Sequence, residues 1–182
     1  MPTLKSELMD EAAVRRTLAR MSHEIIEKNK GAERLCLLGI KRRGVPLAKL
    51  LADNIEKFEG IRVPVGSVDV TLYRDDLTEI TEVPRAEDIF VPVDVTRHTL
   101  ILVDDVIYTG RTARAAIEAV FSVGRPAVLQ LAALIDRGHR ELPIRPDFVG
   151  KNIPTSRDEI VSVLTDEIDG RTAVRILQKD GT

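Results

Sequence analysis

Hydrophobic and polar positions follow two different periods along this chain, and the change of period outlines its elements. A helical spacing predicts one helix from a cap at Asp10 to about residues 30–31, with an apolar stripe formed by Val14, Leu18, Met21 and Ile25. Short apolar runs with polar flanks predict buried strands instead. We place strands at residues 34–40, 63–72, 100–103 and 128–135, and further helices at 45–57 and 113–120.

Strands and helices alternate through most of the sequence, which predicts an α/β fold with a central, mostly parallel sheet flanked by helices. Near the C-terminus, residues 160–164 and 173–177 predict a hairpin around Asp169-Gly170. Residues 74–97 and 136–158 fit neither pattern, and connections of that length are usually functional. With 182 residues in total, we expect one domain.

Residues 100–112, LILVDDVIYTGRT, are the most informative stretch. The apolar run predicts a strand that ends in two adjacent carboxylates, Asp104 and Asp105, and open α/β sheets bind ligands at the carboxyl ends of their strands. The following Thr-Gly turn leads into a helix, whose first N–H groups favour a phosphate. Two acids beside such a cradle suit a sugar phosphate, although an acidic strand end before an ordinary helix cap is the simpler alternative.

A second loop, residues 39–44, has the sequence GIKRRG and follows another predicted strand. Its glycines permit unusual backbone geometry, and the three cations between them match the charge of a pyrophosphate. These cations are Lys41, Arg42 and Arg43. A solvated basic turn would have the same composition, but the position at a strand's carboxyl end favours the pyrophosphate.

The pattern of residues 100–112 resembles the motif with which type I phosphoribosyltransferases bind phosphoribosyl pyrophosphate (PRPP). The resemblance implies that family's fold, with a small hood and a flexible flap, and Mg²⁺ held indirectly with PRPP beside Asp104 and Asp105. It also implies a peptide bond that is often cis in loop 39–44. Catalytic roles are implied for Arg43, Asp104 and Asp105. The implied PRPP-binding residues are Lys41, Arg42, Arg43, Tyr73, Arg74, Asp104, Asp105, Val106, Ile107, Tyr108, Thr109, Gly110, Arg111 and Thr112.

The flap implied by this resemblance corresponds to about residues 73–97. Its candidate contacts to the pyrophosphate are Tyr73 and Arg74, in the sequence DVTLYRDD. Closure of a flap would exclude water from a glycosyl cation that water would otherwise hydrolyse. A polar surface loop is the alternative for either residue.

The irregular segment, which we call the hood (about residues 136–158), makes the resemblance more specific. Its sequences DRGHRELPIR and GKNIPTS are similar to those of pyrimidine-operon attenuation regulators that are also uracil phosphoribosyltransferases. The similarity extends over nearly the whole chain. It implies the reaction of uracil with PRPP to give UMP and pyrophosphate. It also implies binding of UMP or UTP, and of a stem-loop in the leader of pyrimidine biosynthetic mRNA.

Further binding residues follow from the same resemblance. Arg137, Ile160 and Val161 are implied as contacts to the nucleotide base. The RNA surface would combine the N-terminal helix with the basic hood, since phosphate contact requires clustered cations. A solvated surface charge is the alternative for any single basic residue. The implied RNA contacts are Arg20, His23, Lys28, His139, Arg140, Arg145 and Lys151.

Composition narrows the function classes. The net charge of −2 excludes a generally basic nucleic-acid binder but allows a local basic patch. The one cysteine, Cys36, lies in an apolar run, so we expect a buried thiol and no disulfide framework. No apolar run reaches the roughly 18 residues of a membrane span, and the N-terminus lacks the apolar core of a signal peptide. We expect a cytoplasmic homo-oligomer, a dimer or larger, with no membrane partner.

The predicted function is a UMP- or UTP-responsive, RNA-binding regulator of transcription attenuation that also transfers phosphoribose to uracil. Two alternatives use the same ligand residues: an RNA regulator with little or no transferase activity, and a purely metabolic uracil phosphoribosyltransferase. A purine transferase is a third, against which the hood sequence and Tyr108 argue, because some purine-specific relatives have a carboxylate there. We assign no general base, because a tyrosine, whose phenol has an unperturbed pKa of ~10, does not readily exchange a proton with the base near neutral pH.

Overall fold

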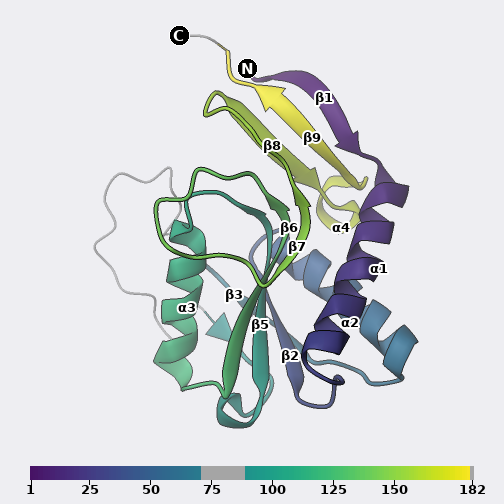
Figure 1. Ribbon diagram of the computed structural model, residues 1–182, viewed down its shortest axis with the longest axis vertical. Coiled ribbons are helices and arrows are strands. Elements are labelled where there is room, and N and C mark those ends of the chain that lie inside the picture. Colours follow the sequence, from purple (N-terminus) through teal and green to yellow (C-terminus); the bar gives the residue numbers. More distant parts are fainter. Residues whose placement is uncertain (71–88, 181–182) are drawn as a thin grey trace.

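The computed structural model describes residues 1–70 and 89–180 of the chain. Within this part, the larger sheet has six strands in the order β4-β3-β2-β5-β6-β7 (Figure 1). Neighbouring strands run parallel except β4, which is antiparallel to β3. The strands are β2 (Leu35–Ile40), β3 (Val65–Val68), β4 (Ile89–Phe90), β5 (Thr99–Ile107), β6 (Val128–Asp136) and β7 (Phe148–Asn152).

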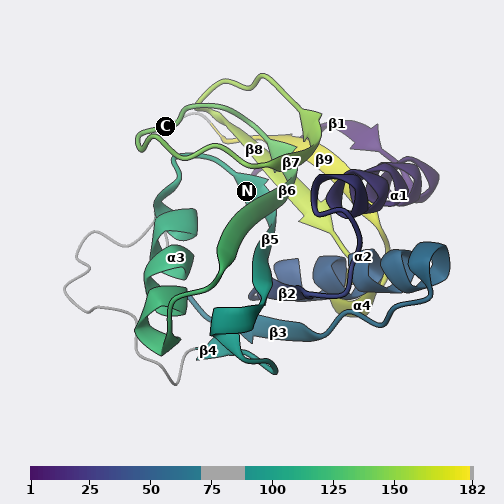
Figure 2. The same ribbon diagram turned by 60° about the horizontal axis from the view of Figure 1, so that its bottom comes forward.

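Helices cover both faces of this sheet, as Figure 2 shows. One face carries α1 (Glu11–Lys28) and α2 (Gly44–Glu59), and the other carries α3 (Arg111–Val123). Because successive strand residues point to opposite faces, Leu37 packs with α1 and α2 while Leu38 packs with α3. Two apolar layers result, and the predicted α/β class with a mostly parallel, helix-flanked sheet is confirmed.

A smaller antiparallel sheet lies at one end of the larger one, at the top of Figure 1. Its strand order is β1-β9-β8. The strands β8 (Glu159–Leu164) and β9 (Ala173–Gln178) form the predicted hairpin, with the short helix α4 (Asp166–Asp169) between them. The strand β1 (Thr3–Met9) was not predicted, because only Met9 in it is buried and no apolar alternation marks it.

The predicted N-terminal helix is confirmed, together with its cap. Asp10 accepts a hydrogen bond from the backbone N–H of Ala13 at 2.8 Å. Just after the helix, Lys30 and Gly31 have positive φ values of 54° and 125°, which turn the chain toward β2.

Two strand predictions need correction. Residues 104–107 were expected beyond the strand that begins near residue 100, but β5 continues through Ile107 because β6 still pairs with it there. The hood was expected to be irregular, yet β7 lies within it and extends the sheet parallel to β6. Its sequence FVGKN is short, and only Phe148 in it is buried. The local pattern was therefore too weak to indicate a strand.

Burial of Cys36 is confirmed, and burial raises the pKa of its thiol to about 12. Among the described residues, no helix is both long and apolar enough to cross a membrane.

Candidate functional site

One cavity of about 410 Å³ lies where β2 and β5 end. It collects side chains from the loop after β2, the end of β5, the start of α3 and the first residues of the hood. Most of the predicted PRPP residues that the structure describes line it, together with Arg137. The lining residues are Ile40, Lys41, Arg42, Arg43, Val70, Asp104, Asp105, Val106, Ile107, Tyr108, Gly110, Thr112, Ala113 and Arg137.

Some predicted site residues do not line this cavity. Ile160 and Val161 lie on β8, half-buried, and Thr109 and Arg111 belong to the same loop as the lining residues without facing the cavity. The flap residues Tyr73 and Arg74 lie outside the described residues.

The loop of residues 39–44, which we call the pyrophosphate loop, presents its cations directly to the cavity. The peptide bond between Lys41 and Arg42 is cis, as the resemblance implied. Glycines bracket the loop because backbone passes close by. A Cβ on Gly39 would lie 2.4 Å from the Cα of Val45, and one on Gly44 would lie 2.2 Å from the carbonyl oxygen of Val103. The loop and the end of β5 are therefore packed directly on each other.

Arg43 has an unexpected partner at the edge of the cavity. Its guanidinium donates to both carboxylate oxygens of Asp169 on α4, at 3.2 and 2.8 Å. The Arg43 hydrogen bonds hold the pKa of Asp169 below its ordinary value, with help from the backbone N–H of Thr165. The same ion pair raises the pKa of Arg43, to which the nearby charge of Asp105 adds. Arg43 therefore connects the pyrophosphate loop to the smaller sheet's connecting helix.

The two acids lie at a step in the sheet. Pairing between β2 and β5 ends at Gly39 and Val103, whereas pairing between β5 and β6 continues past Asp104. The side of β5 that faces the pyrophosphate loop is thus open at Asp104 and Asp105. Each carboxylate accepts a bond from the next backbone N–H, at 2.9 Å for Asp104 and 2.8 Å for Asp105. These bonds orient both side chains where they line the cavity.

Two helices begin at the cavity wall, and neither has a side-chain cap from the residue that precedes it. Arg43 precedes α2, and Gly110, with φ of 96°, precedes α3. The first N–H of α3 is bonded nearby, because the backbone N–H of Arg111 donates to Oγ1 of Thr109 at 3.2 Å. By contrast, Asp10 caps α1. Unsatisfied N–H groups and the helix dipole make helix N-termini favourable for anions. The geometry of the cavity is therefore suited to anionic groups near both N-termini.

The hood packs directly on residues 108–111, where the turn after β5 leads into α3. Arg140 donates to the carbonyl oxygen of Tyr108 and to the carboxylate of Asp136, each at 2.7 Å. The backbone N–H of Glu141 donates to the carbonyl oxygen of Thr109 at 2.8 Å. An ion pair of 2.6 Å joins the side chains of Arg111 and Glu141. The conformation of this loop therefore depends on the hood.

Arg137 lines the cavity from the hood. Its guanidinium carbon lies 4.1 Å from the centroid of the Tyr108 ring, and its Nη2 donates to the carbonyl oxygen of Ser156 at 3.0 Å. Burial lowers the pKa of Arg137, whose residue is 7% exposed. Its Nε has no hydrogen-bond partner among the described residues. A buried, rigid cation with an unsatisfied donor is suited to a planar polar ligand.

The geometry agrees with the comparisons to known proteins. The family model described as "Phosphoribosyl transferase domain" matches residues 5–167. This chain belongs to the phosphoribosyltransferase family. Its relatives include proteins named "Bifunctional protein PyrR" in Clostridium novyi, 61% identical, and Clostridium perfringens strain 13, 60% identical, each over 96% of this chain and 98% of the relative. One in Caldicellulosiruptor bescii is 58% identical over 96% of both chains.

Solved structures of phosphoribosyltransferases share the fold. A hypoxanthine phosphoribosyltransferase from Trypanosoma cruzi has a TM-score of 0.75 at 21% identity, covering 96% of each chain. One from Staphylococcus aureus has a TM-score of 0.70 at 21% identity, covering 86% of this chain and 81% of that one. The predicted type I phosphoribosyltransferase fold and the resemblance to the bifunctional PyrR proteins are thus confirmed.

The predicted RNA residues of this phosphoribosyltransferase fall into two groups. The first group lies where α1 packs on β7. Arg20 donates to the carbonyl oxygens of Val149, at 3.3 Å, and Gly150, and Lys28 pairs with Asp147 at 3.1 Å. Close packing requires a glycine here, because a Cβ on Gly150 would lie 2.3 Å from the carbonyl oxygen of Leu134. Arg145 and Lys151 are exposed on the same hood segment.

The second group lies elsewhere. His139 contacts the Tyr108 ring edge-on, with centroids 5.6 Å apart, and its Nε2 is 2.6 Å from the carbonyl oxygen of Thr155. Arg140 makes the contacts to Tyr108 and Asp136 given above. His23 stacks on Phe58 of α2, with centroids 4.0 Å apart. These positions adjoin the phosphoribosyltransferase site or α2 rather than β7.

Sequence reasoning missed the carboxylates that hold the cavity arginines. Asp169 binds Arg43 directly. Glu159 interacts with Arg137 through its charge and through Ser156, to which both residues are hydrogen-bonded. Neither acid follows a parallel strand of the larger sheet. The rule that ligands bind at the carboxyl ends of such strands therefore did not select them. Their partners are distant in sequence, with 126 residues separating Arg43 from Asp169.

A metal cluster built from protein side chains is absent from the described residues, since no three His, Cys, Asp or Glu gather there. The two adjacent carboxylates of the cavity, Asp104 and Asp105, are nevertheless hard oxygen ligands. Mg²⁺ is commonly held by one or two carboxylates plus the phosphates of its substrate. The residues present fit a Mg²⁺ ion that arrives with a polyphosphate ligand.

Proposed function

We propose that this phosphoribosyltransferase converts uracil and PRPP to UMP and pyrophosphate. We also propose that it responds to UMP or UTP by binding a stem-loop in the leader of pyrimidine biosynthetic mRNA, which attenuates transcription. The observation that carries the proposal is the arrangement of the cavity between β2 and β5. Two helix N-termini, the cations of the pyrophosphate loop and two carboxylates meet at one cavity, which Arg137, placed over the Tyr108 ring, also lines.

Each part of PRPP has a matching part of the cavity. Lys41, Arg42 and Arg43 would bind the pyrophosphate, and the N-terminus of α3 with residues 108–112 would bind the 5′-phosphate. The carboxylates of Asp104 and Asp105 would accept hydrogen bonds from the ribose hydroxyls. Tyr73 and Arg74 remain proposed flap contacts.

The reaction forms a bond between N1 of uracil and C1′ of the ribose while the bond from C1′ to the pyrophosphate oxygen breaks. Positive charge develops on the ribose, and the adjacent carboxylates stabilise it. Arg42 and Arg43 stabilise the negative charge on the departing pyrophosphate. Mg²⁺ held with Asp104 and Asp105 would supply further neutralisation of the pyrophosphate. The N1 proton of uracil is released in the same reaction, either to solvent or to the departing pyrophosphate, and no side chain is assigned as its acceptor.

The base would occupy the side of the cavity formed by Arg137 and Tyr108. A guanidinium held in one plane suits hydrogen bonding to the carbonyl groups of a pyrimidine. Ile160 and Val161 are retained as proposed contacts from the neighbouring strand β8. The relatives are named "Bifunctional protein PyrR". That name favours a protein with a second activity over a purely metabolic uracil phosphoribosyltransferase.

The transferase proposal is tested by spectrophotometric measurement of UMP formation from uracil and PRPP in the presence of Mg²⁺. Guanine and hypoxanthine serve as control bases. Turnover of PRPP with uracil, but with neither of the control bases, supports the proposal. Turnover with a purine and not with uracil contradicts it and favours a purine transferase, whereas nucleotide binding without turnover favours a regulator that lacks transferase activity.

The RNA proposal rests on the basic surface where α1 meets β7. Arg20 and Lys28 come from α1, Lys151 comes from β7, and Arg145 comes from the hood just before β7. His23, His139 and Arg140 are the remaining proposed contacts. Because Arg140 also supports the loop at Tyr108, it is a poor choice for separating RNA binding from catalysis. The better test is the double variant Arg145→Ala with Lys151→Ala, since both side chains are exposed.

Filter binding to a pyrimidine-leader stem-loop, across a salt series and with a scrambled stem-loop as control, measures the effect of that double variant. Removal of one cation that binds a phosphate should reduce the log–log salt slope by about 0.7 to 0.9. UMP formation should remain near the wild-type rate. Unchanged affinity and slope would contradict this RNA surface. Sedimentation of the same samples checks whether the protein is the proposed homo-oligomer.

The proposed cytoplasmic location is compatible with the single cysteine, Cys36, which is a buried free thiol.

A further inference from the structure

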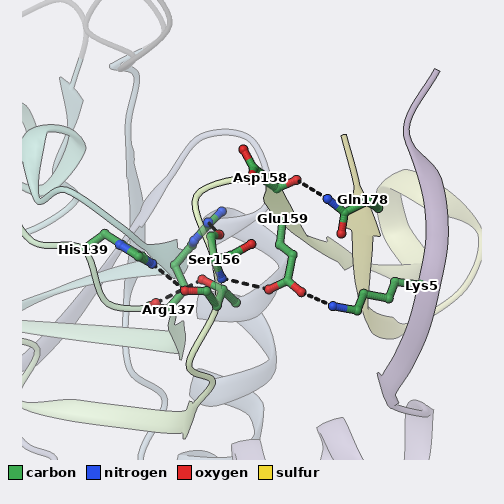
Figure 3. Close-up of polar contacts among 8 residues, drawn as sticks. Lys5, Arg137, His139, Ser156, Asp158, Glu159 and Gln178 are labelled. Carbon is green, nitrogen blue, oxygen red and sulfur yellow. Dashed lines mark hydrogen bonds and ion pairs between the residues drawn. The ribbon is translucent and has the colours of Figure 1, made fainter. Parts of the chain in front are cut away.

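The cavity arginine Arg137 is held from behind by a chain of hydrogen bonds that ends on the first strand of the protein (Figure 3). The Nη2 of Arg137 donates to the carbonyl oxygen of Ser156 at 3.0 Å. The backbone N–H of Ser156 donates to Oε2 of Glu159 at 2.9 Å. The Nζ of Lys5 donates to the other oxygen of the same carboxylate. Figure 3 shows the carboxylate of Glu159 lying between Ser156 and Lys5.

Glu159 is almost enclosed, since its side chain is only 10% exposed. A carboxylate in such a place requires partners for its charge. Hydrogen bonds from Lys5 and then from Ser156 hold the pKa of Glu159 below its ordinary value, so the group is ionised at neutral pH. The charge of Arg137 acts in the same direction. Glu159 therefore balances two cations, one on each side.

The backbone of β1 is shaped to deliver Lys5 to this carboxylate. In its pairing with β9, Leu4 lies opposite Leu177 and Ser6 lies opposite Ile176, which leaves Lys5 as an extra residue between them. Such a bulge bends a strand and redirects a side chain. Because β9 separates β1 from β8 in the smaller sheet, Lys5 reaches across the middle strand to contact Glu159.

The segment between Arg137 and Glu159 is fixed at further points. The hydroxyl of Thr155 donates to the carbonyl oxygen of Arg137 at 3.2 Å, and the carbonyl oxygen of Thr155 contacts His139. A displacement of Ser156 would therefore move the guanidinium of Arg137 relative to the Tyr108 ring. The hydrogen bonds of this chain lie on the base side of the cavity, so such a movement would affect that end first.

We propose that Glu159 and Lys5 are positioning residues that set the affinity of the site for a uracil nucleotide by fixing the guanidinium of Arg137. Both act through Arg137 rather than by touching the ligand. The inference rests on the proposed function, because that function assigns Arg137 to the base.

The experiment compares Lys5→Met, Lys5→Arg and Glu159→Gln with the wild-type protein. Lys179→Met is the matched control, since Lys179 is an exposed lysine just after β9 whose Nζ donates to the carbonyl oxygen of Arg157. Calorimetry measures the Kd for UMP and for PRPP separately, and initial rates give KM for uracil and kcat. Circular dichroism melting checks that each variant is folded.

Lys5→Met should raise the Kd for UMP and the KM for uracil by roughly 3- to 10-fold, the range for one partly exposed, charge-assisted hydrogen bond. Glu159→Gln should act in the same direction. The Kd for PRPP and kcat at saturating uracil should stay within about twofold of wild type. Lys5→Arg should restore most of the UMP affinity, because an arginine retains the cation, and Lys179→Met should change nothing.

An equal loss of UMP and PRPP affinity would overturn the proposal, since it would show a general structural role for the smaller sheet. Wild-type affinity for UMP in both Lys5→Met and Glu159→Gln would also overturn it. Failure of the proposed function gives a different result: the wild-type protein itself would then bind PRPP but neither bind UMP nor use uracil.

Discussion

On the side of the cavity proposed for the phosphates, the lining residues come from the loop after β2, the end of β5 and the start of α3. On the base side, Arg137 takes its position from contacts that lead through Ser156 and Glu159 to Lys5, 154 residues from Glu159 in sequence. The phosphate side is a local product of the sheet edge. The base side is a product of tertiary assembly, and it joins the larger sheet to the smaller one.

This difference means that substitutions on the two sides should have separable effects. Changes on the phosphate side should act first on PRPP and pyrophosphate. Changes on the base side should act first on UMP and uracil. Three sets of variants test the separation, in order of decreasing expected effect, and a fourth experiment with a smaller effect tests the ion pair that holds Arg43.

The largest effect is expected for Asp104→Asn and Asp105→Asn. Each removes a charged acceptor for the ribose, which costs about 1.5–3 kcal/mol, or roughly 10- to 150-fold in kcat/KM for PRPP. The fold should be retained, because both side chains line the cavity and their bonds to backbone N–H groups can be kept by an amide oxygen. Steady-state kinetics at varied PRPP measures the decrease. Asp53→Asn, an exposed change on α2, is the control, and wild-type turnover in the double variant would refute the assignment.

On the base side, Arg137→Lys should weaken UMP binding by roughly 10-fold while PRPP affinity changes little. A lysine cannot stack a planar group on Tyr108 and at the same time direct a second donor to Ser156. Calorimetric titration with each ligand measures the two affinities. Arg157→Lys, an exposed change in the same segment, should behave as wild type. A greater decrease for PRPP than for UMP would abolish the distinction between the two sides.

Arg43→Ala should weaken PRPP and pyrophosphate by roughly 5- to 10-fold and UMP less, because one charge-assisted contact to the phosphates is removed. Lys49→Ala is a matched control. Lys49 also joins α2 to α4, through Glu167 at 3.0 Å, but lies outside the cavity. Equal effects of both variants on both ligands would indicate that the ion pairs only hold α4 in place.

The smallest effect concerns pH. Arg43 above all, and the N–H of Thr165, hold the pKa of Asp169 below its ordinary value of 3.8. The Asp169 carboxylate therefore stabilises the folded state at pH values above this ordinary pKa. The stabilisation is lost as the pH falls through the lower pKa of the folded state. In thermal unfolding, the Tm difference between wild type and Asp169→Asn should shrink from about pH 6 to about pH 3. A difference that is constant over this interval would contradict the ion pair's contribution.

The same contrast explains how much could be predicted from the sequence. The strands β2, β5 and β6 are largely buried on both faces, so their apolar runs could be recognised in the sequence. The end of β5 carries the acids of the proposed phosphate side, and the loop after β2 carries its cations. The edge strands β1 and β7 have mostly exposed or half-buried residues and gave no such pattern. Their positions depend on β9 and β6.

The supporting residues of the site were unpredictable for a related physical reason. A carboxylate such as Asp169 or Glu159 becomes informative only when its cation is known, and both cations come from distant segments. Of the three predicted base contacts, only Arg137 lines the cavity, and its prediction came from the resemblance to the attenuation regulators. Composition and periodicity alone would have left it as one of several basic residues in the hood.

The close approach of Gly44 to Val103 has a consequence for protein engineering. With only 2.2 Å between a Cβ at Gly44 and the carbonyl oxygen of Val103, the pyrophosphate loop and the end of β5 share one surface with no spacer. A loop grafted from another enzyme would therefore have to fit the backbone of β5 in this protein, in addition to having the right length. Redesign of polyphosphate preference in this scaffold is best attempted by transplanting the loop, the strand end and the start of α2 together, as a single cassette.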